Sequence, residues 1–261
     1  MAVVEQTVDD GVAVLTLNRP ERLNAWTAEL GRAYSDLLED CAARDDVRTI
    51  VVTGAGRGFC AGADMNDLQA IGGDGVDAAR SAADSRPQTF ALTIPKPIVA
   101  AINGPCAGLG LVHALMCDIR FAADDAKLTT AFSRRGLVAE HGISWILPRL
   151  VGPACALDLL LSARVVLGAE AEQLGLVNRA LPRDRVLDGA VAYARELAAN
   201  CSPSSMATMK RQVYSALEQP LSQALAEADG LMLESFGAPD FAEGVTSFLE
   251  RREPRFEALS D

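Results

Sequence analysis

The stretch PIVAAINGPCAGLGLVHALMCD, residues 97–118, decides how the fold of this chain is read. It begins with an apolar, β-branched run at residues 98–102, which predicts a buried strand. Residues 103–105 read Asn-Gly-Pro and predict a turn, because all three residue types interrupt regular structure. Gly108 and Gly110 then stand where an apolar helix is expected to begin. The stretch therefore predicts a strand, a glycine-rich turn and a helix start.

A helix start of this kind leaves backbone N–H groups free to bind a ligand. The first N–H groups of a helix have no acceptor inside it, and the helix dipole favours negative charge there. Glycine lets a ligand approach the backbone closely. A membrane helix is disfavoured, since residues 103–105 leave pieces too short to span a bilayer. A buried strand and helix with no ligand remains an open alternative, because glycines also serve close packing.

The composition indicates a soluble globular chain with a substantial core. It has 261 residues, of which 49% are hydrophobic and 23% charged, as is typical of globular domains. The formal net charge of -11 argues against a nucleic-acid partner, because phosphate backbones are bound by clustered Lys and Arg. This net charge does not exclude a small anionic ligand that is bound by backbone N–H groups.

Cysteine usage and the absence of targeting signals suggest a cytoplasmic protein. The six cysteines form no CxxC pair and lie in apolar segments, so we expect reduced, buried thiols. The first residues lack the basic-then-apolar layout of a signal peptide. No stretch is expected to span a membrane.

Local patterns in the first half predict strands joined by a helix. Two β-rich runs at residues 3–8 and 12–17 flank an Asp-Gly pair, which predicts a hairpin. Thr27 is a candidate N-cap for an amphipathic helix, and a strand follows at residues 48–53. Such a strand, helix and strand suggest a parallel crossover unit. A glycine-rich loop comes next at residues 54–64.

The rest of the chain is predicted to be increasingly helical. Residues 64–95 are expected to form two helices around a mobile connection. The patterns then predict strands at residues 119–122, 127–130, 165–166 and 176–181, and helices at 142–150, 154–162, 168–174, 186–199, 206–217, 221–236 and 241–252. The last helices carry more apolar surface than a lone extension needs, so we expect them to pack against another subunit.

Two glycine-flanked turns carry the chemical signal. One ends in Gly62, Ala63 and Asp64, and the other contains Leu109 between two glycines. If both preceding strands belong to one parallel sheet, both turns lie at the edge where such sheets bind ligands. Two backbone N–H groups that converge on one oxygen would form an oxyanion hole, which stabilises charge developing on a carbonyl.

Three linked motifs give the chain a family resemblance. NRPERLNAW, GRGFCAGAD and the stretch at 97–118, in this order and spacing, resemble the crotonase family, that is the enoyl-CoA hydratase/isomerase superfamily. The resemblance covers nearly the whole chain. It implies an α/β fold, a crotonase-like spiral of ββα repeats at residues 1–195, and a C-terminal helical trimerisation region at residues 196–261. A homotrimer or a dimer of trimers is expected.

The resemblance also implies an acyl-CoA thioester substrate and a set of site residues. The N–H groups of Ala63 and Leu109 would bind the thioester oxygen and stabilise an enolate, and Gly108 would make room for it. Coenzyme A belongs to the substrate, so no separate cofactor and no metal is expected. The further residues that match substrate-binding positions are Arg22, Leu23, Ala25, Ala61, Asp64, Met65, Asn66 and Phe132.

The chain departs from the pattern of the family's hydratases. Their two glutamates fall on Val112 and Phe132, neither of which can transfer a proton. Glu140 stands eight positions after Phe132, where peroxisomal Δ3-Δ2-enoyl-CoA isomerases carry their catalytic glutamate and dienoyl-CoA isomerases an aspartate. A single carboxylate can remove a proton α to the carbonyl and return it two carbons away. Burial by the apolar neighbours Val138, Ala139, Ile143 and Trp145 would favour this work by raising the pKa of the Glu140 carboxyl.

The resemblance therefore favours a Δ3-Δ2-enoyl-CoA isomerase with Glu140 as base. The alternatives are an enoyl-CoA hydratase, or another acyl-CoA lyase or hydrolase, with a different acid/base set, and a non-catalytic acyl-CoA-binding protein of this fold. Glu140 also has a structural interpretation, as a cap or dipole partner of the helix at 142–150. His141 is a candidate helper, and His113 is expected to be a satisfied core residue. Lys210 and Arg211 are candidates for the CoA phosphates, although a charged, solvated helix face is the preferred interpretation of the pair.

Overall fold

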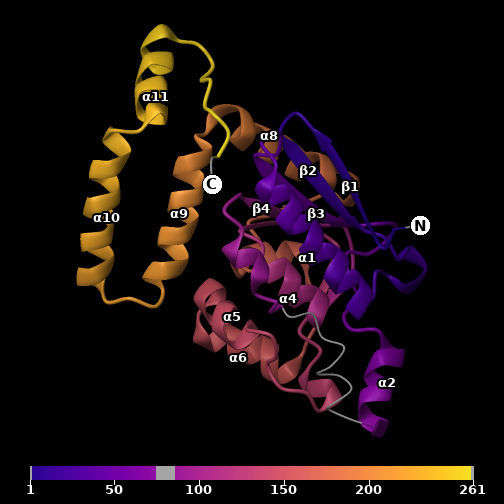
Figure 1. Cartoon of the computed structure of the whole chain (residues 1–261). Coiled ribbons are helices and arrows are strands. Elements are labelled where there is room, and N and C mark those ends of the chain that lie inside the picture. The colour runs from indigo at the N-terminus through magenta and orange to yellow at the C-terminus, as the bar shows by residue number, and fades with distance from the viewer. Residues whose placement is uncertain (1, 75–85, 260–261) are drawn as a thin grey trace.

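The computed structural model describes residues 2–74 and 86–259 of the chain. A twisted sheet with helices on its faces forms the main body, and three helices project from it as an arm (Figure 1). The strands are β1 (Val4–Asp9), β2 (Val12–Leu17), β3 (Thr49–Gly54), β4 (Ile98–Ile102), β5 (Cys106–Ala107), β6 (Ile119–Ala123), β7 (Lys127–Thr129), β8 (Val166–Leu167) and β9 (Arg179–Leu181).

The main sheet has six strands in the order β1-β2-β3-β4-β6-β9. β1 and β2 form the predicted antiparallel hairpin, whose turn residues Asp10 and Gly11 have φ values of 46° and 76°. Asp-Gly tolerates this left-handed geometry, which matches the twist of the flanking strands. The other neighbouring strands pair in parallel. β3 and β4 are therefore adjacent, as the position of the two glycine turns required.

A second, smaller sheet lies beside the first. It has the order β5-β7-β8, in which β5 and β7 pair in parallel and β7 and β8 antiparallel. β5 follows β4 and β7 follows β6 of the main sheet, whereas β8 follows α6, so the chain passes repeatedly from one sheet to the other as it advances. This alternation forms the layered spiral and replaces the single crossover sheet that local patterns suggested.

Helices cover the sheets and form the arm. They are α1 (Ala28–Ala43), α2 (Met65–Asp74), α4 (Leu109–Leu115), α5 (Ile143–Val151), α6 (Pro153–Ser162), α7 (Gly168–Gln173), α8 (Val186–Asn200), α9 (Pro203–Ala216), α10 (Leu221–Phe236) and α11 (Pro239–Glu250). Four 3-10 turns add η1 (Pro20–Arg22), η2 (Phe90–Thr93), η3 (Ser133–Arg135) and η4 (Arg183–Arg185).

Capping residues and prolines determine where several helices begin. Thr27 accepts a hydrogen bond from Leu30 N–H and caps α1, as predicted. α9 and α11 begin two or three residues earlier than predicted, at Pro203 and Pro239. Proline suits the first helical position, since its missing N–H would have no partner there. In the region predicted to hold two helices and a mobile connection, α2 and η2 are present, and residues 75–85 lie outside the described residues.

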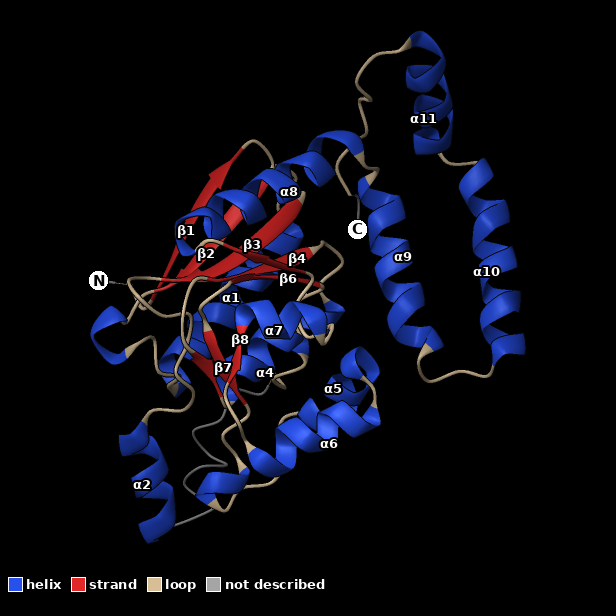
Figure 2. Cartoon of the chain, turned by 180° about the vertical axis from the view of Figure 1, so that it is seen from behind, coloured by secondary structure: helices blue, strands red, loops and turns tan. Residues whose placement is uncertain are grey.

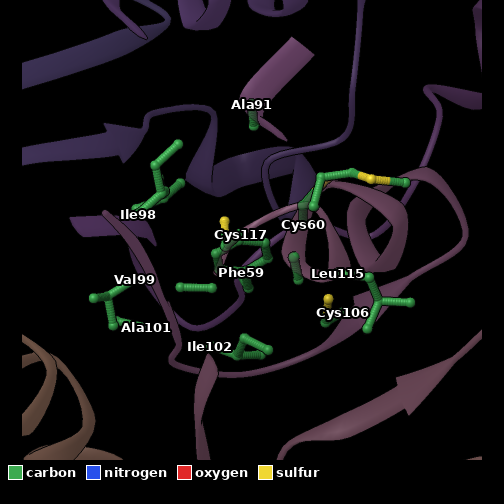
Figure 3. Close-up of a cluster of buried hydrophobic side chains, with 14 of the residues drawn as sticks. Phe59, Cys60, Ala91, Ile98, Val99, Ala101, Ile102, Cys106, Leu115 and Cys117 are labelled. Carbon is green, nitrogen blue, oxygen red and sulfur yellow. The ribbon is translucent and has the colours of Figure 1, made fainter. Parts of the chain in front are cut away.

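The core is continuous from the main sheet to the small one. β3, β4 and nearly all of α4 are buried, and Figure 3 shows Phe59, Ile98 and Leu115 within this cluster. The expectation of buried thiols holds for four cysteines but not for Cys155 and Cys201, which are partly exposed.

The C-terminal arm begins after α8. α8 packs on β2, β3, β4 and β6, and the expected domain boundary at 195/196 falls within this helix. α9, α10 and α11 then stand away from the sheets, as seen from both sides in Figures 1 and 2. The segment in which the chain leaves the body is therefore Cys201 and Ser202.

One stretch has the length and composition of a membrane helix, contrary to the sequence expectation. It comprises the 20 residues Ile143–Ser162. The chain breaks it at Gly152, where φ is 77° and ψ is 157°, into α5 and α6, which pack against each other. Each piece is about 15 Å long at 1.5 Å per residue, about half of what a bilayer core requires.

Candidate active site

The two glycine turns lie side by side at the carboxyl ends of β3 and β4. A Cβ atom at Gly62 would stand 2.9 Å from the carbonyl oxygen of Ala107 and 3.8 Å from Cα of Gly108. Both glycines have positive φ, 99° at Gly62 and 50° at Gly108. Side chains there would be strained and would push the turns apart. The two turns, which the sequence placed at one edge of the sheet, are therefore adjacent in the fold.

Each turn presents a free backbone donor beside its glycine. Leu109 is the first residue of α4, so its N–H has no acceptor inside the helix. Ala63 is bracketed by Trp26, whose N–H donates to Gly62 O at 2.7 Å and whose carbonyl accepts from Asp64 N–H at 2.9 Å. Neither Ala63 N–H nor Leu109 N–H donates to an acceptor within residues 2–74 and 86–259. Two such donors side by side can bind a thioester oxygen and stabilise an enolate.

Close backbone packing fixes the spacing of the two turns. Cys60 and Cys106 form a parallel bridge, and Ala107 N–H donates to Cys60 O at 3.0 Å. A Cβ atom at Gly110 would lie 2.3 Å from that same carbonyl oxygen. α4 has only seven residues, so the pair of free N–H donors at Ala63 and Leu109 matters more here than the dipole of α4.

Two residues that sequence reasoning did not single out hold the loop that precedes the site. Asn24, fully buried, donates from Nδ2 to the carbonyls of Ala55, Gly58 and Phe59 and accepts from Arg19 N–H. Arg19 donates to Ala25 O and to Asp64 Oδ2. Both residues stand in the motif NRPERLNAW. The proline and the turn-forming residues of this motif indicate a turn, but nothing in the local sequence indicates these long-range contacts.

Asp64 has a structural function in this arrangement. Its Oδ1 accepts from Asn66 N–H at 3.1 Å, and its Oδ2 pairs with Arg19 at 3.1 Å. The Asn66 N–H bond, aided by the Arg19 charge, lowers the pKa of the Asp64 carboxyl. An ionised carboxylate tied in this way orders the wall of the site and is not free to move a proton.

The other predicted substrate-binding residues surround the same loop. Ala61 N–H donates to Leu23 O at 3.0 Å, and Ala25 N–H to Arg22 O at 3.1 Å. Leu23, Ala25 and Ala61 are half-buried, while Arg22 is exposed. Met65 and Asn66 stand exposed on the first turn of α2. The predicted CoA segment and the oxyanion loop are therefore in direct backbone contact.

The two positions that match the hydratase glutamates are closed and apolar. Val112 lies on α4 and is 0% exposed, and Phe132 precedes η3 and is 5% exposed. Both belong to the hydrophobic core cluster. Neither position can supply or activate a water molecule.

Glu140 lies in the turn that leads into α5. His141 Nε2 stands 3.5 Å from Glu140 Oε2, and the two side chains are 40% and 30% exposed. The cap of α5 is Gly142, and Glu140 accepts the Ile143 N–H bond through its backbone carbonyl, not its carboxylate. The capping interpretation of the side chain is therefore wrong. The expected burial of the Glu140 side chain by Val138 is also wrong, because Val138 is itself 75% exposed.

The Glu140 turn reaches the glycine turns through α4. A Cβ atom at Gly142 would lie 3.3 Å from Met116 Cε, and Met116 ends α4. α5 packs on α4, the helix that begins with Leu109. The Glu140 turn therefore packs against the C-terminal end of α4, the helix whose first residue is Leu109.

His113 differs from the satisfied core residue that was expected. It is 5% exposed and stacks on Trp26, with ring centroids 3.6 Å apart. Neither of its ring nitrogens has a hydrogen-bond partner in the described part of the chain. Burial, with a smaller contribution from the His141 charge, lowers the pKa of His113 to about 3. The ring is neutral and buried, but it is not satisfied.

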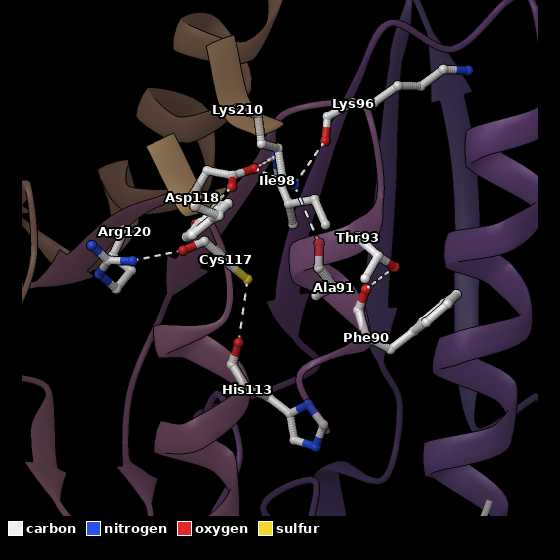
Figure 4. Close-up of polar contacts among 11 residues, drawn as sticks. Phe90, Ala91, Thr93, Lys96, Ile98, His113, Cys117, Asp118, Arg120 and Lys210 are labelled. Atoms are coloured by element: carbon white, nitrogen blue, oxygen red, sulfur yellow. Dashed lines mark hydrogen bonds and ion pairs between the residues drawn. The ribbon is translucent and has the colours of Figure 1, made fainter. Parts of the chain in front are cut away.

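Lys210 is committed to the protein interior and not to a phosphate. Its Nζ donates to Asp118 Oδ2 at 2.8 Å and to the carbonyls of Ala91 and Lys96, and only 7% of the side chain is exposed (Figure 4). Tyr214 Oη donates to the other oxygen of Asp118. These contacts fasten α9 to η2, to the start of β4 and to the segment between α4 and β6, so Lys210 lies neither on a solvated helix face nor free for a phosphate.

Comparison with known proteins identifies the family. The sequence profile described as enoyl-CoA hydratase/isomerase matches residues 7–259. The chain is 36% identical to the 1,2-epoxyphenylacetyl-CoA isomerase of Escherichia coli K12, over 98% of each chain.

Solved structures agree with the sequence relatives. A crystal structure of an enoyl-CoA hydratase from Polaromonas sp. JS666 superposes with a TM-score of 0.91 at 30% identity, covering 97% of this chain and 99% of the other. An enoyl-CoA hydratase from Mycobacterium marinum is 47% identical, with a TM-score of 0.71 over 82% of this chain and 98% of its own. The crotonase resemblance and fold class are confirmed. The chain is a member of the enoyl-CoA hydratase/isomerase family and an enzyme of acyl-CoA thioesters.

Proposed function

We propose that this enzyme is a Δ3-Δ2-enoyl-CoA isomerase in which Glu140 moves the proton. The observation that carries the proposal is the apolar, closed character of Val112 and Phe132, which occupy the positions of the hydratase glutamates. Glu140 is the carboxylate at the position where related isomerases keep theirs, and its side chain is ionisable, accessible and free of a cap bond. The name of the Escherichia coli relative, an acyl-CoA isomerase, is compatible with this assignment.

The proposed reaction is a proton transfer within the substrate. The thioester oxygen accepts hydrogen bonds from Ala63 N–H and Leu109 N–H. The Glu140 carboxylate removes a proton from C2, the C2–H electron pair forms an enolate, and the donors stabilise its oxygen. The carboxyl group then returns the proton to C4, and the double bond moves from C3=C4 to C2=C3. Electrons and protons balance within the substrate, so we expect no cofactor beyond the coenzyme A that the substrate carries.

Hydration of a 2-enoyl-CoA is the main rival. Most of the related proteins carry hydratase names, and hydration would use the same pair of N–H donors. It also requires a group that holds and activates water near C3. Glu140 with His141 would have to supply that function alone. A protein that binds acyl-CoA without turnover is the remaining alternative.

Glu140→Gln tests the assignment. The purified protein is incubated with a 3-enoyl-CoA, and formation of the conjugated 2-enoyl thioester is followed by its ultraviolet absorbance. Loss of a general base costs typically ~10²–10⁴ in rate, so we expect kcat to fall by at least about 100-fold while KM changes little. His141→Asn is the matched control, because it removes the neighbouring ring and keeps the carboxylate.

The same preparations are then given a 2-enoyl-CoA. The isomerase assignment predicts little 3-hydroxyacyl-CoA from any of them. Rapid hydration by the unaltered protein that survives Glu140→Gln would refute it in favour of a hydratase with another acid/base set. Binding of acyl-CoA with no turnover of either substrate would instead favour the binding protein.

A further inference from the structure

His113 is a buried polar group that the proposed reaction does not use. It lies on α4 one turn beyond Leu109, and its ring stacks on Trp26 at an interplanar angle of 18°. Its backbone carbonyl accepts a contact from the Cys117 thiol, whereas its ring carries no contact in Figure 4. Both ring nitrogens are buried and without a partner in the part of the chain that the structure describes.

An imidazole in this state is costly for the free protein. A buried donor or acceptor without a partner loses its hydrogen bond to water and gains none in return, and a leucine of similar size would avoid that loss. The neighbouring Tyr34 lies edge-on to the same ring, with ring centroids 5.6 Å apart, and its hydroxyl is also buried without a hydrogen-bond partner in the described part of the chain. Burial first and then the adjacent Cys117 thiol raise the pKa of its phenol. His113 differs in carrying two such atoms on one ring.

The position of the ring connects it to the candidate active site. Trp26 is the residue whose backbone brackets Ala63, and its ring stacks on His113, so the pair connects the Ala63 loop to the helix that begins with Leu109. At 100° per residue, Leu109, Val112 and His113 share one face of α4. The charge of His141, next to Glu140, also acts on His113. The unpaired nitrogens therefore lie on the Leu109 face of α4, one helical turn beyond that donor.

We propose that His113 is a specificity residue for acyl-CoA substrates that carry an oxygen on the acyl chain. The neutral ring offers one N–H donor and one acceptor nitrogen, which together suit a ketone or hydroxyl oxygen. Four residues of α4 rise about 6 Å, so that oxygen belongs about four or five carbons beyond the thioester carbonyl. The inference rests on the proposed function for the identity of the site, but not on the isomerisation step.

Binding of two saturated thioesters tests the inference. The ligands are 5-oxohexanoyl-CoA and its apolar counterpart 5-methylhexanoyl-CoA, neither of which has a double bond to move. Dissociation constants are measured by titration calorimetry on the full-length protein. One hydrogen bond is worth about 1 kcal/mol or slightly more, so we expect the keto ligand to bind about 5- to 10-fold more tightly.

The variants separate recognition from packing. His113→Phe keeps a ring for the Trp26 stack and removes both nitrogens, so the preference should fall to about 1. Tyr34→Phe is the control in the same aromatic cluster, and it should keep the preference. If His113→Phe does not fold, His113→Leu replaces it, and the preference of the unaltered protein remains a test by itself.

Each result bears on one of the two proposals. Equal affinity of the unaltered protein for the two thioesters would overturn the role of His113, and so would a preference that His113→Phe leaves unchanged. A preference abolished by His113→Phe in a protein that moves no double bond would support the specificity residue and refute the isomerase. Failure to bind either thioester would refute both.

Discussion

A histidine sealed from water titrates far from its usual range. Burial is the main reason that the pKa of His113 falls from 6.5 to about 3, and the positive charge of His141 adds to it. The folded protein therefore holds this ring neutral at pH values where the unfolded chain has it protonated. The chain contains only two histidines, so this difference is not hidden among many groups of the same kind.

The first prediction at this scale concerns stability against pH. Between pH 6.5 and about 3 the unfolded chain binds one more proton at His113 than the folded protein does. Stability must therefore rise with pH through this window and level off above 6.5, with a slope approaching about 1.4 kcal/mol per pH unit below pH 5.5. Replacing His113 by Phe should remove about 2 kcal/mol from the change in stability between pH 7 and pH 5.

Urea unfolding of both proteins at pH 5, 6 and 7 measures this difference. Groups other than His113 contribute to both proteins alike, so the difference between them isolates the buried ring. His141→Asn removes the half-exposed histidine and should keep most of the slope. Parallel curves for His113→Phe and the unaltered protein would show that His113 is not held neutral by the fold.

At the scale of elements, two helical glycines differ in the space that a side chain would find. Gly110 is in α4, where a Cβ atom would lie 2.3 Å from Cys60 O and 2.7 Å from Cys60 Cβ. Gly230 is in α10, where a Cβ atom would meet nothing within 4 Å. The first glycine is required by the contact of two backbones, and the second only lowers helix propensity.

Alanine substitutions at these two positions should therefore have opposite signs. Gly110→Ala forces α4 away from the loop that carries Ala63 and should cost about 1–3 kcal/mol or more. It should also lower kcat at least about 10-fold, since a small misplacement of reacting groups is costly. Gly230→Ala should stabilise the protein by up to about 1 kcal/mol and leave kcat unchanged. Urea unfolding and the isomerase assay measure both effects.

Elements with strong local signals were predictable from sequence, and contacts between distant elements were not. Asp10 and Gly11 specify the hairpin, and Thr27 specifies the start of α1, because each acts on residues within a few positions. Of the small sheet, β7 and, within one residue, β8 were predicted. β5 was missed because it has two residues and no periodicity, and the pairing of the three strands has no local signal. The alignment of the two glycine turns was predictable because β3 and β4 each read as a buried strand.

The same reasoning explains the errors at the site. Lys210 seemed available for phosphates because its partner Asp118 is far away in sequence. Asn24 was overlooked, since its three carbonyl partners lie in a loop more than 30 residues later. Val138 looked like cover for Glu140 because it is apolar, yet its position in a turn leaves it exposed. Each error concerns a contact that only the assembled fold defines.

At the scale of the whole molecule, the arm carries apolar surface that one chain does not bury. α9, α10 and α11 enclose a hollow of about 650 Å³, and no residue of α10 is buried. Large apolar side chains that stand at least half exposed in this arm are Met209, Val213, Leu221, Leu225, Leu233, Phe236, Phe248 and Leu249. Apolar surface gathered in this way is typical of interaction sites, and the trimer or dimer of trimers expected from the sequence stays a prediction for this surface.

The last prediction is that charges on this arm separate the subunits without unfolding them. Light scattering coupled to size-exclusion chromatography should give a mass of three or six copies for the unaltered protein. Leu233→Glu with Phe248→Glu, at positions 66% and 82% exposed in one chain, should shift the mass toward one copy, because burying two carboxylates in an apolar interface is costly. Leu187→Glu, on α8 outside the arm, is the control and should leave the mass unchanged. The main body holds its own core, so circular dichroism of the dissociated variant should stay that of a folded protein.

A single-copy mass for the unaltered protein would contradict the assembly, and a variant that keeps three or six copies would place the interface elsewhere.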